Sequence, residues 1–599
     1  MYLSRIYIKN FRNFKSLDVA LNGDAVVLGE NRVGKSNLLY ALRLIFDHRL
    51  SDSERQLDLS DFWDGLETYG AENHIVISVE IKDFDHDPDI LAILTDFRLD
   101  NDHATIRLSY ELRVKADLDG NDPISSDDFE FICYGGESYT KTFGHKLRRR
   151  IAMDVLPALR DAEGDLAVWR RSPLRPLVKE AFRNINQNDL ATIGSAIEEA
   201  TEEITKFQEV RDLQQRIADT FVKMSGPRQD IQPGLGFSPA DPARLHRSIR
   251  LLIDNGSRGI NDASLGSANL VFLSLKTLEI NQLISENSRD HTFLAIEEPE
   301  AHLHPHLQRS VYRQLFESVD GEERPGTLSV ILTTHSPHIA SVSPLRSIVL
   351  LKDGGESGTV GYSAQTIKLS DDEADDIARY LDVTRAEMLF ARGVILVEGD
   401  AEKFLIPAFA ERISQPLDRL GISVCSVSGT NFSPYVKFLS GLGIPFSVIT
   451  DRDPREGKIP LAFNRIRKLI TVLNEHHIEG NLDTVLPELD GIDDYDNFCE
   501  QCEEFGIFSN QQTLEVDLFK EGFSDSIIRV LREYKLSATQ KELVDSWDEN
   551  SGALDASHLL KMIDRIGKGR FAQRLLSHCE ENDPPGYIER AIKYVADRV

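Results

Sequence analysis

The chain has 599 residues, of which 41% are hydrophobic and 28% charged, and its formal net charge at pH 7 is −30. At about one to two hundred residues per domain, this length allows several domains, and the composition is typical of a soluble globular protein. No run of eighteen apolar residues occurs, which excludes a membrane-spanning helix. Five cysteines are too few for a disulfide scaffold, and no secretory signal opens the sequence. We therefore expect a reduced, cytoplasmic protein without a membrane partner.

The acidic total does not favour a nucleic-acid partner, because proteins that bind phosphates usually carry a basic surplus. It does not exclude one either, since an average over the chain hides local patches. Carboxylates that hold metal ions also count as acidic while serving phosphate chemistry. The densest basic run is KLRRR at residues 146–150. For this run we favour a solvated helix face over a contact with DNA.

Alternating apolar residues predict a strand at residues 3–14, and a second strand at 24–28 leads into a loop and a helix. Residues 73–115 alternate in places and suggest antiparallel strands. Residues 177–225 contain one glycine, no proline and many charged or amide side chains. This composition predicts long, exposed helices that project from the globular body. The proline- and glycine-rich segment 227–242 is expected to return to that body.

The loop at residues 29–36 reads GENRVGKS and matches the phosphate-binding pattern GxxxxGKS in full, between a strand and a helix. Backbone N–H groups of such a loop wrap phosphates, helped by the positive end of the helix dipole. Lys35 is expected to reach the β- and γ-phosphates of ATP, and Ser36 to ligate magnesium. The residues expected to contact the nucleotide here are Gly29, Asn31, Gly34, Lys35, Ser36 and Asn37.

Two further strand ends support a site for ATP hydrolysis. The apolar run 293–296 ends in Glu297 and Glu298, of which the first can hold the metal through water and the second can orient the attacking water. A later strand ends at His335, which is placed to contact the γ-phosphate. The nearby HLHPH run (302–306) follows the acidic pair directly, which disfavours a separate histidine metal site.

The order of these motifs resembles that of ATP-binding-cassette ATPases of the SMC and RecF kind. Residues 264–269, SLGSAN, resemble their signature, which opens a helix and caps the γ-phosphate of the opposite subunit through positions matching Ser264, Gly266 and Ser267. One departure is Glu297, where most cassette ATPases place Asp. Because the chain has one P-loop and one signature, it cannot close a composite site alone. We therefore expect a homodimer or a higher even assembly such as a tetramer.

A second group of acidic residues follows later strands. Glu398 closes an apolar strand at 393–397, and Glu402 lies four residues on, in the first turn of the next helix. Asp451 and Asp453 follow a strand at 446–450. Parallel strands place such residues at one edge of the sheet. Two divalent cations about 4 Å apart need several carboxylates, so we favour a two-metal site over a solvated acidic rim.

The patterns EGxxE at 398–402 and DxD at 451–453 resemble a Toprim domain. A Toprim domain behind a cassette ATPase resembles the OLD family (overcoming lysogenization defect) of nucleases, which includes the nuclease subunit of Gabija antiphage systems. The segments IKNFRNF, VLPALRDAEGDL, EEPEAHLHPHLQ and SGTNFSPYVKFL resemble that family as well.

The resemblance implies a DNA endonuclease that uses a pair of Mg²⁺, Mn²⁺ or Ca²⁺ ions. Its metal ligands would be the four carboxylates named above together with Glu515, for which Asp517 is the alternative. Lys568 would stabilise charge at the scissile phosphate. A role in antiphage defence or DNA processing follows from the same resemblance, and a UvrD-like helicase partner stays open.

The predicted fold is α/β, with an ABC-type (SMC/RecF-like) ATPase domain that carries a helical dimerisation insertion, followed by a Toprim domain with helical additions. The expected boundaries are 1–155 for the first part of the ATPase, 156–235 for the insertion, 236–385 for the second part, and 386–599 for the Toprim domain. One alternative function is an ATP-gated DNA clamp with an inactive Toprim domain, and another is a topoisomerase or primase. The sequence leaves open whether ATP stimulates or inhibits cleavage.

Overall fold

The computed structural model describes most of the chain. The described residues are 1–69, 73–85, 88–115, 123, 125–158, 162–169, 172–225, 247, 249–254, 257–316, 327–455, 458–475, 494–579 and 582–599. They form two compact units, one of Met1–Leu156 with Phe293–Val599 and the other of Pro157–Thr292. The four-part division expected from the sequence stays a prediction, and the expected end of the insertion at residue 235 lies outside the described residues.

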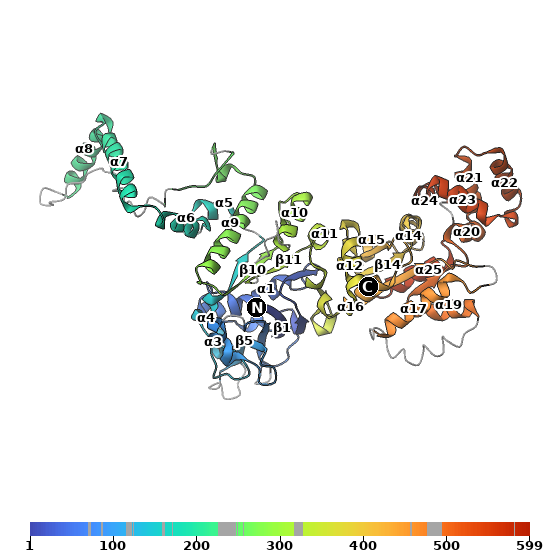
Figure 1. Cartoon of the computed structure of the whole chain (residues 1–599), viewed down its shortest axis with the longest axis horizontal. Helices are drawn as coiled ribbons and strands as arrows, with labels where there is room; N and C mark the ends of the chain where they lie inside the picture. The colour runs from blue at the N-terminus through green and yellow to red at the C-terminus, as the bar shows by residue number, and fades with distance from the viewer. Residues whose placement is uncertain are drawn as a thin grey trace. The chain divides into compact units, whose positions relative to one another are not determined.

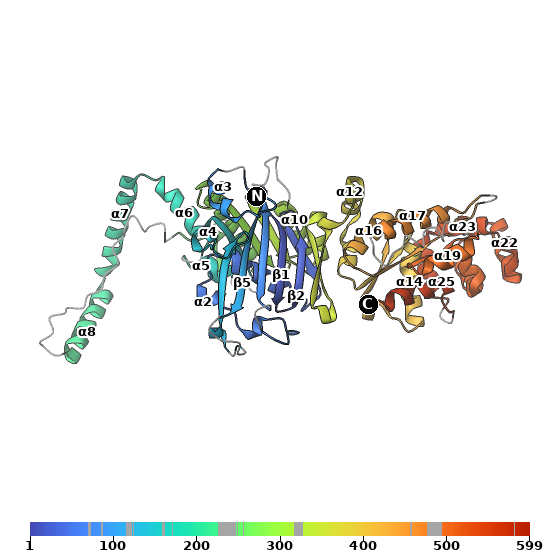
Figure 2. The ribbon, with the colours of Figure 1, turned by 90° about the horizontal axis from the view of Figure 1, so that it is seen from below.

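A five-stranded antiparallel sheet with the order β2-β1-β4-β5-β6 begins the first unit. Its strands are β1 (Tyr2–Phe11), β2 (Phe14–Ala20), β4 (Ile75–Lys82), β5 (Thr105–Val114) and β6 (Phe129–Gly135). Figure 2 shows β1, β2 and β5 as long strands of one layer. Apolar residues alternate along β1 and β4 and point to the core, as the period of two in the sequence requires. The predicted antiparallel pairing within 73–115 is confirmed.

A six-stranded sheet with the order β13-β12-β3-β11-β10-β7 carries the P-loop. Its strands are β3 (Ala25–Gly29), β7 (Ile151–Leu156), β10 (His291–Glu297), β11 (Leu328–Thr333), β12 (Ile348–Asp353) and β13 (Thr359–Ser363). The central strand β3 runs parallel to β11 and β12 and is buried along its whole length. Helix α1 (Lys35–Phe46) follows the P-loop and shares one hydrophobic core with residues of both sheets.

Shorter helices surround this ATPase core. They are α2 (Asp52–Arg55), α3 (Pro88–Leu94), α4 (His145–Arg150), α10 (Pro305–Phe316), α11 (Pro337–Ala340), α12 (Asp371–Tyr380) and α13 (Val383–Ala386). No helix within the described ranges is both long and apolar enough to span a bilayer.

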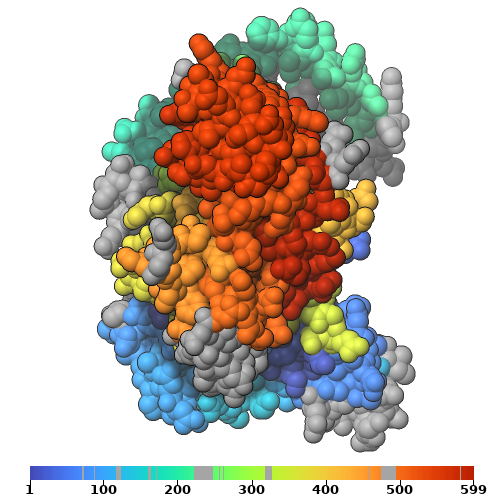
Figure 3. All heavy atoms as spheres, turned by 90° about the vertical axis from the view of Figure 1, so that its right-hand side faces the viewer, coloured from blue at the N-terminus to red at the C-terminus, as the bar shows by residue number. Residues whose placement is uncertain are grey.

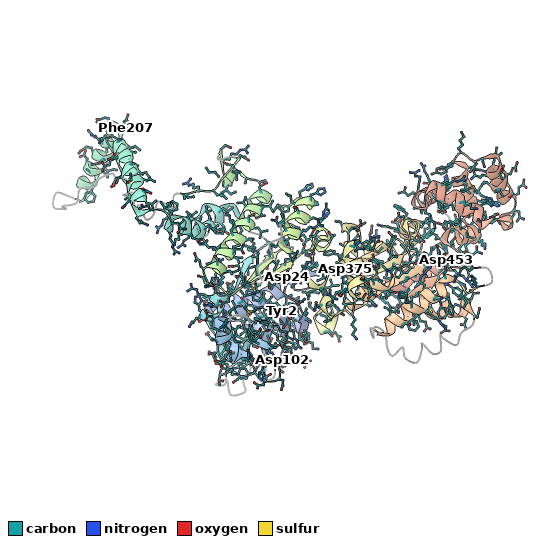
Figure 4. All side chains as sticks on the ribbon, viewed as in Figure 1. Tyr2, Asp24, Asp102, Phe207, Asp375 and Asp453 are labelled. Atoms are coloured by element: carbon teal, nitrogen blue, oxygen red, sulfur yellow. The ribbon has the colours of Figure 1, made fainter. Side chains whose placement is uncertain are left out.

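The second unit is mainly helical. Its elements are α5 (Ala162–Ala167), α6 (Leu174–Arg183), α7 (Gln187–Thr205), α8 (Gln208–Ser225), β8 (Leu252–Ile253), β9 (Arg258–Gly259) and α9 (Leu265–Ser285). Helices α5 and α6 pack against α9, and α7 and α8 follow as two longer helices (Figure 1). The long, exposed helices predicted for this stretch are confirmed. Figure 4 labels Phe207 between α7 and α8.

A four-stranded sheet with the order β15-β14-β16-β17 forms the carboxy-terminal domain, and all its strands are parallel. Its strands are β14 (Gly393–Val397), β15 (Ile422–Ser426), β16 (Phe446–Thr450) and β17 (Ile507–Ser509). The main covering helices are α14 (Asp400–Arg412), α15 (Leu417–Leu420), α16 (Ser433–Gly441), α17 (Leu461–Glu475) and α25 (Gly586–Ala596). The bounds predicted for β14 and β16 are confirmed residue for residue.

Further helices extend this domain, as expected for a Toprim domain with helical additions. They are α19 (Tyr495–Glu503), α20 (Leu514–Leu518), α21 (Ser524–Arg532), α22 (Ala538–Glu549), α23 (Ala556–Ile566) and α24 (Lys568–Leu576). Their buried side chains join α14 and α25 in one hydrophobic core. In Figure 3 the orange and red residues of this domain cover the surface that faces the viewer. β17 was missed by the sequence analysis, because three residues give too short a pattern.

Candidate functional site

The P-loop holds Lys35 at the start of α1. Its Nζ donates to the backbone carbonyls of Gly29 at 2.9 Å and Glu30 at 2.8 Å. Burial lowers the pKa of Lys35, and the charges of Glu298 and Glu300 act in the opposite direction. The loop needs glycine at both ends of its tight turn. Gly34 has a φ of 88°, and a Cβ on Gly29 would lie 2.5 Å from the carbonyl oxygen of Leu351.

Other expected nucleotide contacts lie beside this lysine. Asn31 and Ser36 are exposed, and Asn37 is half-buried. The guanidinium of Arg12 donates to Asn37 Oδ1 at 2.8 Å and to Asp61 Oδ1 at 2.8 Å. The IKNFRNF segment therefore fixes the first turn of the P-loop helix. The sequence analysis matched this segment to the family without assigning it that role.

The acidic pair and His335 come together at the ends of β10 and β11. Glu297 ends β10, and the backbone N–H of Glu298 donates to the carbonyl of Thr333 at 2.9 Å. His335 Nε2 lies 3.9 Å from Glu298 Oε1. Burial and the positive charge of Lys35 lower the pKa of His335, so its imidazole is neutral at pH 7. The structure thus brings Lys35, Glu298 and His335 into one site.

Glu300 is a residue that the sequence analysis missed. Its carboxylate accepts hydrogen bonds from the Thr334 hydroxyl at 2.7 Å and from the backbone N–H of His335 at 2.6 Å. These bonds fix the segment that carries His335 against the turn after β10. The signal available in the sequence was the third glutamate of EEPE, which the analysis passed over.

The signature-like segment lies in the second unit. Ser264 is the N-cap of α9, and its Oγ accepts a hydrogen bond from the backbone N–H of Ser267 at 3.2 Å. Gly266 lies in the first turn between them. The segment therefore opens a helix, as the signature of cassette ATPases does.

The second acidic group lies at the carboxyl ends of β14 and β16, near the label of Asp453 in Figure 4. Glu398 Oε1 accepts from the Thr450 hydroxyl at 2.6 Å and from the backbone N–H of Asp451 at 2.9 Å. Asp451 Oδ1 accepts from the side-chain amide of Asn510 and from the backbone N–H of Leu514 at 3.1 Å. Glu398 and Asp451, predicted from separate strands, are therefore neighbours.

Burial and mutual repulsion raise the pKa values of two carboxylates in this cluster, Glu402 and Asp451. Burial raises the pKa of Glu402 to about 7, and Glu515 and Glu398 add to the shift. The pKa of Asp451 rises well above its usual range because it is buried and faces Glu398, Glu402 and Glu515. These carboxylates are therefore close enough to repel one another, and a cation among them would relieve that repulsion.

Two basic side chains face the cluster. Arg465 of α17 forms ion pairs with Glu398 at 2.6 Å and with Asp453 at 2.8 Å. Lys568, at the start of α24, lies 3.1 Å from Glu515 Oε1. Burial alone would lower the pKa of Lys568, but Glu515, Asp451 and Glu402 raise it above its ordinary value. Lys568 therefore stays protonated, and Arg465 is a second residue that the sequence analysis missed.

Glu515 and Asp517 differ in their surroundings. Glu515 is 1% exposed, and neither of its carboxylate oxygens forms a hydrogen bond within the described residues, although Lys568 is close enough for an ion pair. Asp517 Oδ2 instead accepts from the backbone N–H groups of Gln511 and Gln512. Asp517 fixes the turn before α20, whereas Glu515 is a buried carboxylate beside the cluster that accepts no hydrogen bond from the part of the chain that the structure describes.

This donor set fits a divalent cation. No three His, Cys, Asp or Glu side chains of the described ranges already surround one point as a finished metal site. Arg465 holds one oxygen of Glu398 and one of Asp453 in this structure. All the candidate ligands are nevertheless carboxylate oxygens, which hard divalent cations prefer. Glu515 is buried and its oxygens accept no hydrogen bond from the described residues, so its carboxylate is suited to act as a metal ligand.

The basic run at 146–150 lies in the short helix α4. Arg148 is buried in α4, and its Nε donates to the carbonyl of Ile45 at 3.0 Å. Its guanidinium lies over the ring of Phe143. Arg148 therefore supports the core of the ATPase and is not available to DNA. The predicted solvated face is wrong for Arg148, whereas Lys146 and Arg149 are exposed as predicted.

Comparison with known protein families matches two domains in this chain. A model of the AAA ATPase domain family matches residues 1–144 and 155–340. A model of the Toprim domain of overcoming lysogenization defect-like proteins matches residues 389–453. The chain thus belongs to the AAA ATPase domain family and joins that domain to a Toprim domain. Together the two domains imply the use of ATP and a divalent cation.

Two named relatives are similar to this chain over most of its length. The OLD nuclease of Thermus scotoductus is 26% identical over 470 residues, which cover 75% of this chain and 82% of that protein. Endonuclease GajA of Bacillus cereus strain VD045 is 23% identical over 474 residues, 76% of each chain. The solved carboxy-terminal region of the Burkholderia pseudomallei OLD protein is 45% identical, covering 35% of this chain and 98% of that one, with a TM-score of 0.29. The chain thus joins an AAA ATPase domain to an OLD-like Toprim domain, and proteins named OLD nuclease and endonuclease GajA are its homologues over most of its length.

Proposed function

We propose that this protein is an ATP-binding, metal-dependent DNA endonuclease whose Toprim domain hydrolyses phosphodiester bonds under regulation by its ATPase domain. The observation that carries the proposal is the buried cluster of Glu398, Glu402, Asp451 and Glu515 beside Lys568. The relatives named OLD nuclease and endonuclease GajA support DNA as the substrate. A role in antiphage defence or DNA processing follows from the same kinship.

The proposed chemistry divides among residues of the cluster. A pair of divalent cations, Mg²⁺ or Mn²⁺ in our proposal, supplies an activated water and charge stabilisation at the phosphate. Glu398, Glu402, Asp451, Asp453 and Glu515 would hold them. Asp451 is the candidate for the shared ligand, because the charges of Glu398 after β14, Glu402 in α14 and Glu515 in α20 all act on it. Lys568 stays protonated and stabilises negative charge that develops on the phosphate.

Incubating the protein with supercoiled plasmid and Mg²⁺ or Mn²⁺ tests this function. An endonuclease yields nicked and linear products with free ends, which is the result we expect. Relaxed closed circles would instead indicate a topoisomerase, and unchanged plasmid would favour the alternative of an ATP-gated clamp with an inactive Toprim domain. Either result overturns the proposal.

We further propose that the helical insertion joins two copies of the chain. Helices α7 and α8 expose a series of large apolar side chains, namely Ile193, Ile197, Ile204, Phe207, Leu213 and Ile217. The first three recur on one face of α7, and Phe207 is 61% exposed (Figure 4). A dimer or tetramer that buries this stripe would also supply the second signature that a composite ATP site needs.

The double variant Ile193→Asp/Ile197→Asp should weaken self-association at least about a hundredfold, because each charge replaces an apolar contact of the proposed interface. Sedimentation or mass photometry across protein concentrations measures the effect. Ser195→Asp places the same charge on the opposite face of α7 and should leave assembly unchanged. A wild-type protein that is monomeric at micromolar concentration, with and without ATP, would contradict the proposed interface.

A contact inside the first unit supports regulation by ATP. The guanidinium of Arg392, just before β14 of the Toprim domain, donates to both carboxylate oxygens of Glu30 in the P-loop, at 2.6 and 2.9 Å. Lys352 of β12 donates to the carbonyl of Gly443, which follows α16. A change in the P-loop on nucleotide binding would thus reach the strand that ends at Glu398.

In Arg392→Ser, the effect of ATP on the cleavage rate should be smaller than in the wild type. The ratio of the rates with and without ATP should move toward one by a factor of roughly two to five. The effect is modest because both partners are about half exposed and the pair is screened by water and salt. Plasmid cleavage at low and high salt measures it, with Arg590→Ser as control, since Arg590 forms a similar forked pair with Glu503 away from the P-loop. An unchanged ratio in Arg392→Ser would exclude this route of coupling.

We also propose a cytoplasmic protein, and a UvrD-like helicase as a candidate partner. The first follows from the small number of cysteines, and the second from the family resemblance. The genes that neighbour this one would test the second.

A further inference from the structure

Arg465 ties together the two strands that carry the acidic cluster. It lies in the second turn of α17, and its side chain is 13% exposed. One terminal nitrogen, Nη1, donates to Glu398 Oε1 at 2.6 Å, to the hydroxyl of Thr450, and to the carbonyl of Asp451 at 3.3 Å. The other, Nη2, donates to Asp453 Oδ2 at 2.8 Å. One guanidinium thus spans the end of β14 and the end of β16.

These hydrogen bonds involve one oxygen of each of the two carboxylates, Glu398 and Asp453. Glu398 Oε1 accepts from the Thr450 hydroxyl, the backbone N–H of Asp451 and Arg465, which saturates that oxygen. Arg465 likewise holds only Oδ2 of Asp453. Among the described residues, no side chain or backbone group donates to the second oxygen of either carboxylate, so that oxygen can bind a ligand in an orientation set by the fork. Such a fork is specific to arginine, because a lysine ammonium cannot present two parallel donors.

The charge of Arg465 also bears on the cation. A guanidinium stays protonated at every pH at which the protein is folded, so the cluster always contains a fixed positive charge beside Glu398 and Asp453. That charge lowers the repulsion among the carboxylates without a metal and opposes the approach of a divalent ion.

We propose that Arg465 is a positioning residue of the nuclease centre, which aligns Glu398 and Asp453 for a divalent cation and limits how tightly that cation binds. The inference rests on the proposed function, since it assigns Arg465 a role within that same site. It predicts that affinity for the cation and rate of cleavage move in opposite directions when the charge is removed. A residue with a merely structural role would lower both.

Three variants distinguish the charge of Arg465, its forked hydrogen bonds, and the general effect of losing a positive charge from α17. Arg465→Gln removes the charge, Arg465→Lys keeps the charge without the fork, and Lys468→Gln removes an exposed charge from the same helix one turn on. Mn²⁺ binding is followed by electron paramagnetic resonance of the free ion, with no DNA present. Plasmid cleavage at saturating Mn²⁺ and ATP hydrolysis are measured on the same preparations, and thermal unfolding followed by circular dichroism reports whether each variant is folded.

Arg465→Gln should bind Mn²⁺ roughly tenfold more tightly and cleave at least about tenfold more slowly. Arg465→Lys should keep the wild-type affinity within about threefold yet also cleave slowly, because Glu398 and Asp453 lose their alignment. Lys468→Gln should match the wild type in both measurements. Weaker Mn²⁺ binding by folded Arg465→Gln, or wild-type cleavage by either Arg465 variant, would overturn the inference. If the variants show these Mn²⁺ affinities but the wild-type protein never cuts plasmid, the proposed function is overturned. The effect of Arg465 on the cation is then still supported.

Discussion

Asp451→Ala should abolish DNA cleavage in both Mg²⁺ and Mn²⁺ while ATP hydrolysis persists. Asp451 is the carboxylate on which the charges of Glu398, Glu402 and Glu515 all act. Asn510 and the backbone of Leu514 hold its Oδ1, so the side chain has one fixed orientation. Removing a ligand at this position should disturb both cations, and a change of metal cannot replace it. Plasmid nicking and phosphate release on the same preparations measure the two activities.

Lys568→Ala is the companion change. It should lower the cleavage rate roughly a hundredfold, because one donor of positive charge to the phosphate is lost. Mn²⁺ binding should remain, since an ammonium is not a ligand. Neither substitution touches Lys35, Glu297 or Glu298, so both proteins should hydrolyse ATP at the wild-type rate. If folded Asp451→Ala protein nicks plasmid as fast as the wild type, the nuclease centre lies elsewhere in the molecule.

Glu298→Gln should keep nucleotide binding while slowing ATP hydrolysis by about a thousandfold, as expected for loss of a general base. Glu298 follows the buried strand β10 and faces His335 across 3.9 Å, so an amide of the same size changes charge without changing shape. Binding of a fluorescent ATP analogue and steady-state phosphate release separate the two effects.

Lys35→Ala should instead weaken binding itself, because Lys35 is the buried cation of the P-loop. Glu300→Gln offers a matched control for Glu298→Gln. It alters a carboxylate two residues away that holds the backbone of His335, and its effect should be smaller. Normal turnover by Glu298→Gln would show that another group activates the water.

Local patterns in the sequence predicted much of the fold. Strands β14 and β16 were found residue for residue, because each is a short, fully buried apolar run that ends in a turn with charged residues. The P-loop was also recognised from the sequence, since its glycines, lysine and serine have a fixed spacing between β3 and α1. The strand pattern also predicted that Glu398 and Asp451 lie at one edge of a parallel sheet, and the parallel pairing of β14 with β16 confirms it.

The parts that the sequence did not show depend on contacts between distant segments. Strand β17 has three residues and is defined by its pairing with β16. Arg465 enters the cluster from α17, and a single arginine in an amphipathic helix carries no local signal of that contact. The choice between Glu515 and Asp517 rests on which side chain the backbone of Gln511 and Gln512 engages. Arg148 likewise reads as part of a basic run and is buried against the carbonyl of Ile45.

The central claim is that the carboxylate cluster of the Toprim domain is a divalent-cation centre. A crystal structure of the wild-type protein soaked in Mn²⁺, with anomalous scattering collected at the manganese edge, tests it most directly. The account predicts anomalous density within ligand distance of the proposed ligands, with Lys568 beside it and Asp517 still bound to its backbone amides. These ligands are Glu398, Glu402, Asp451, Asp453 and Glu515. Protein from a batch that cleaves plasmid, but whose Toprim cluster shows no manganese at saturating concentration, would contradict the account.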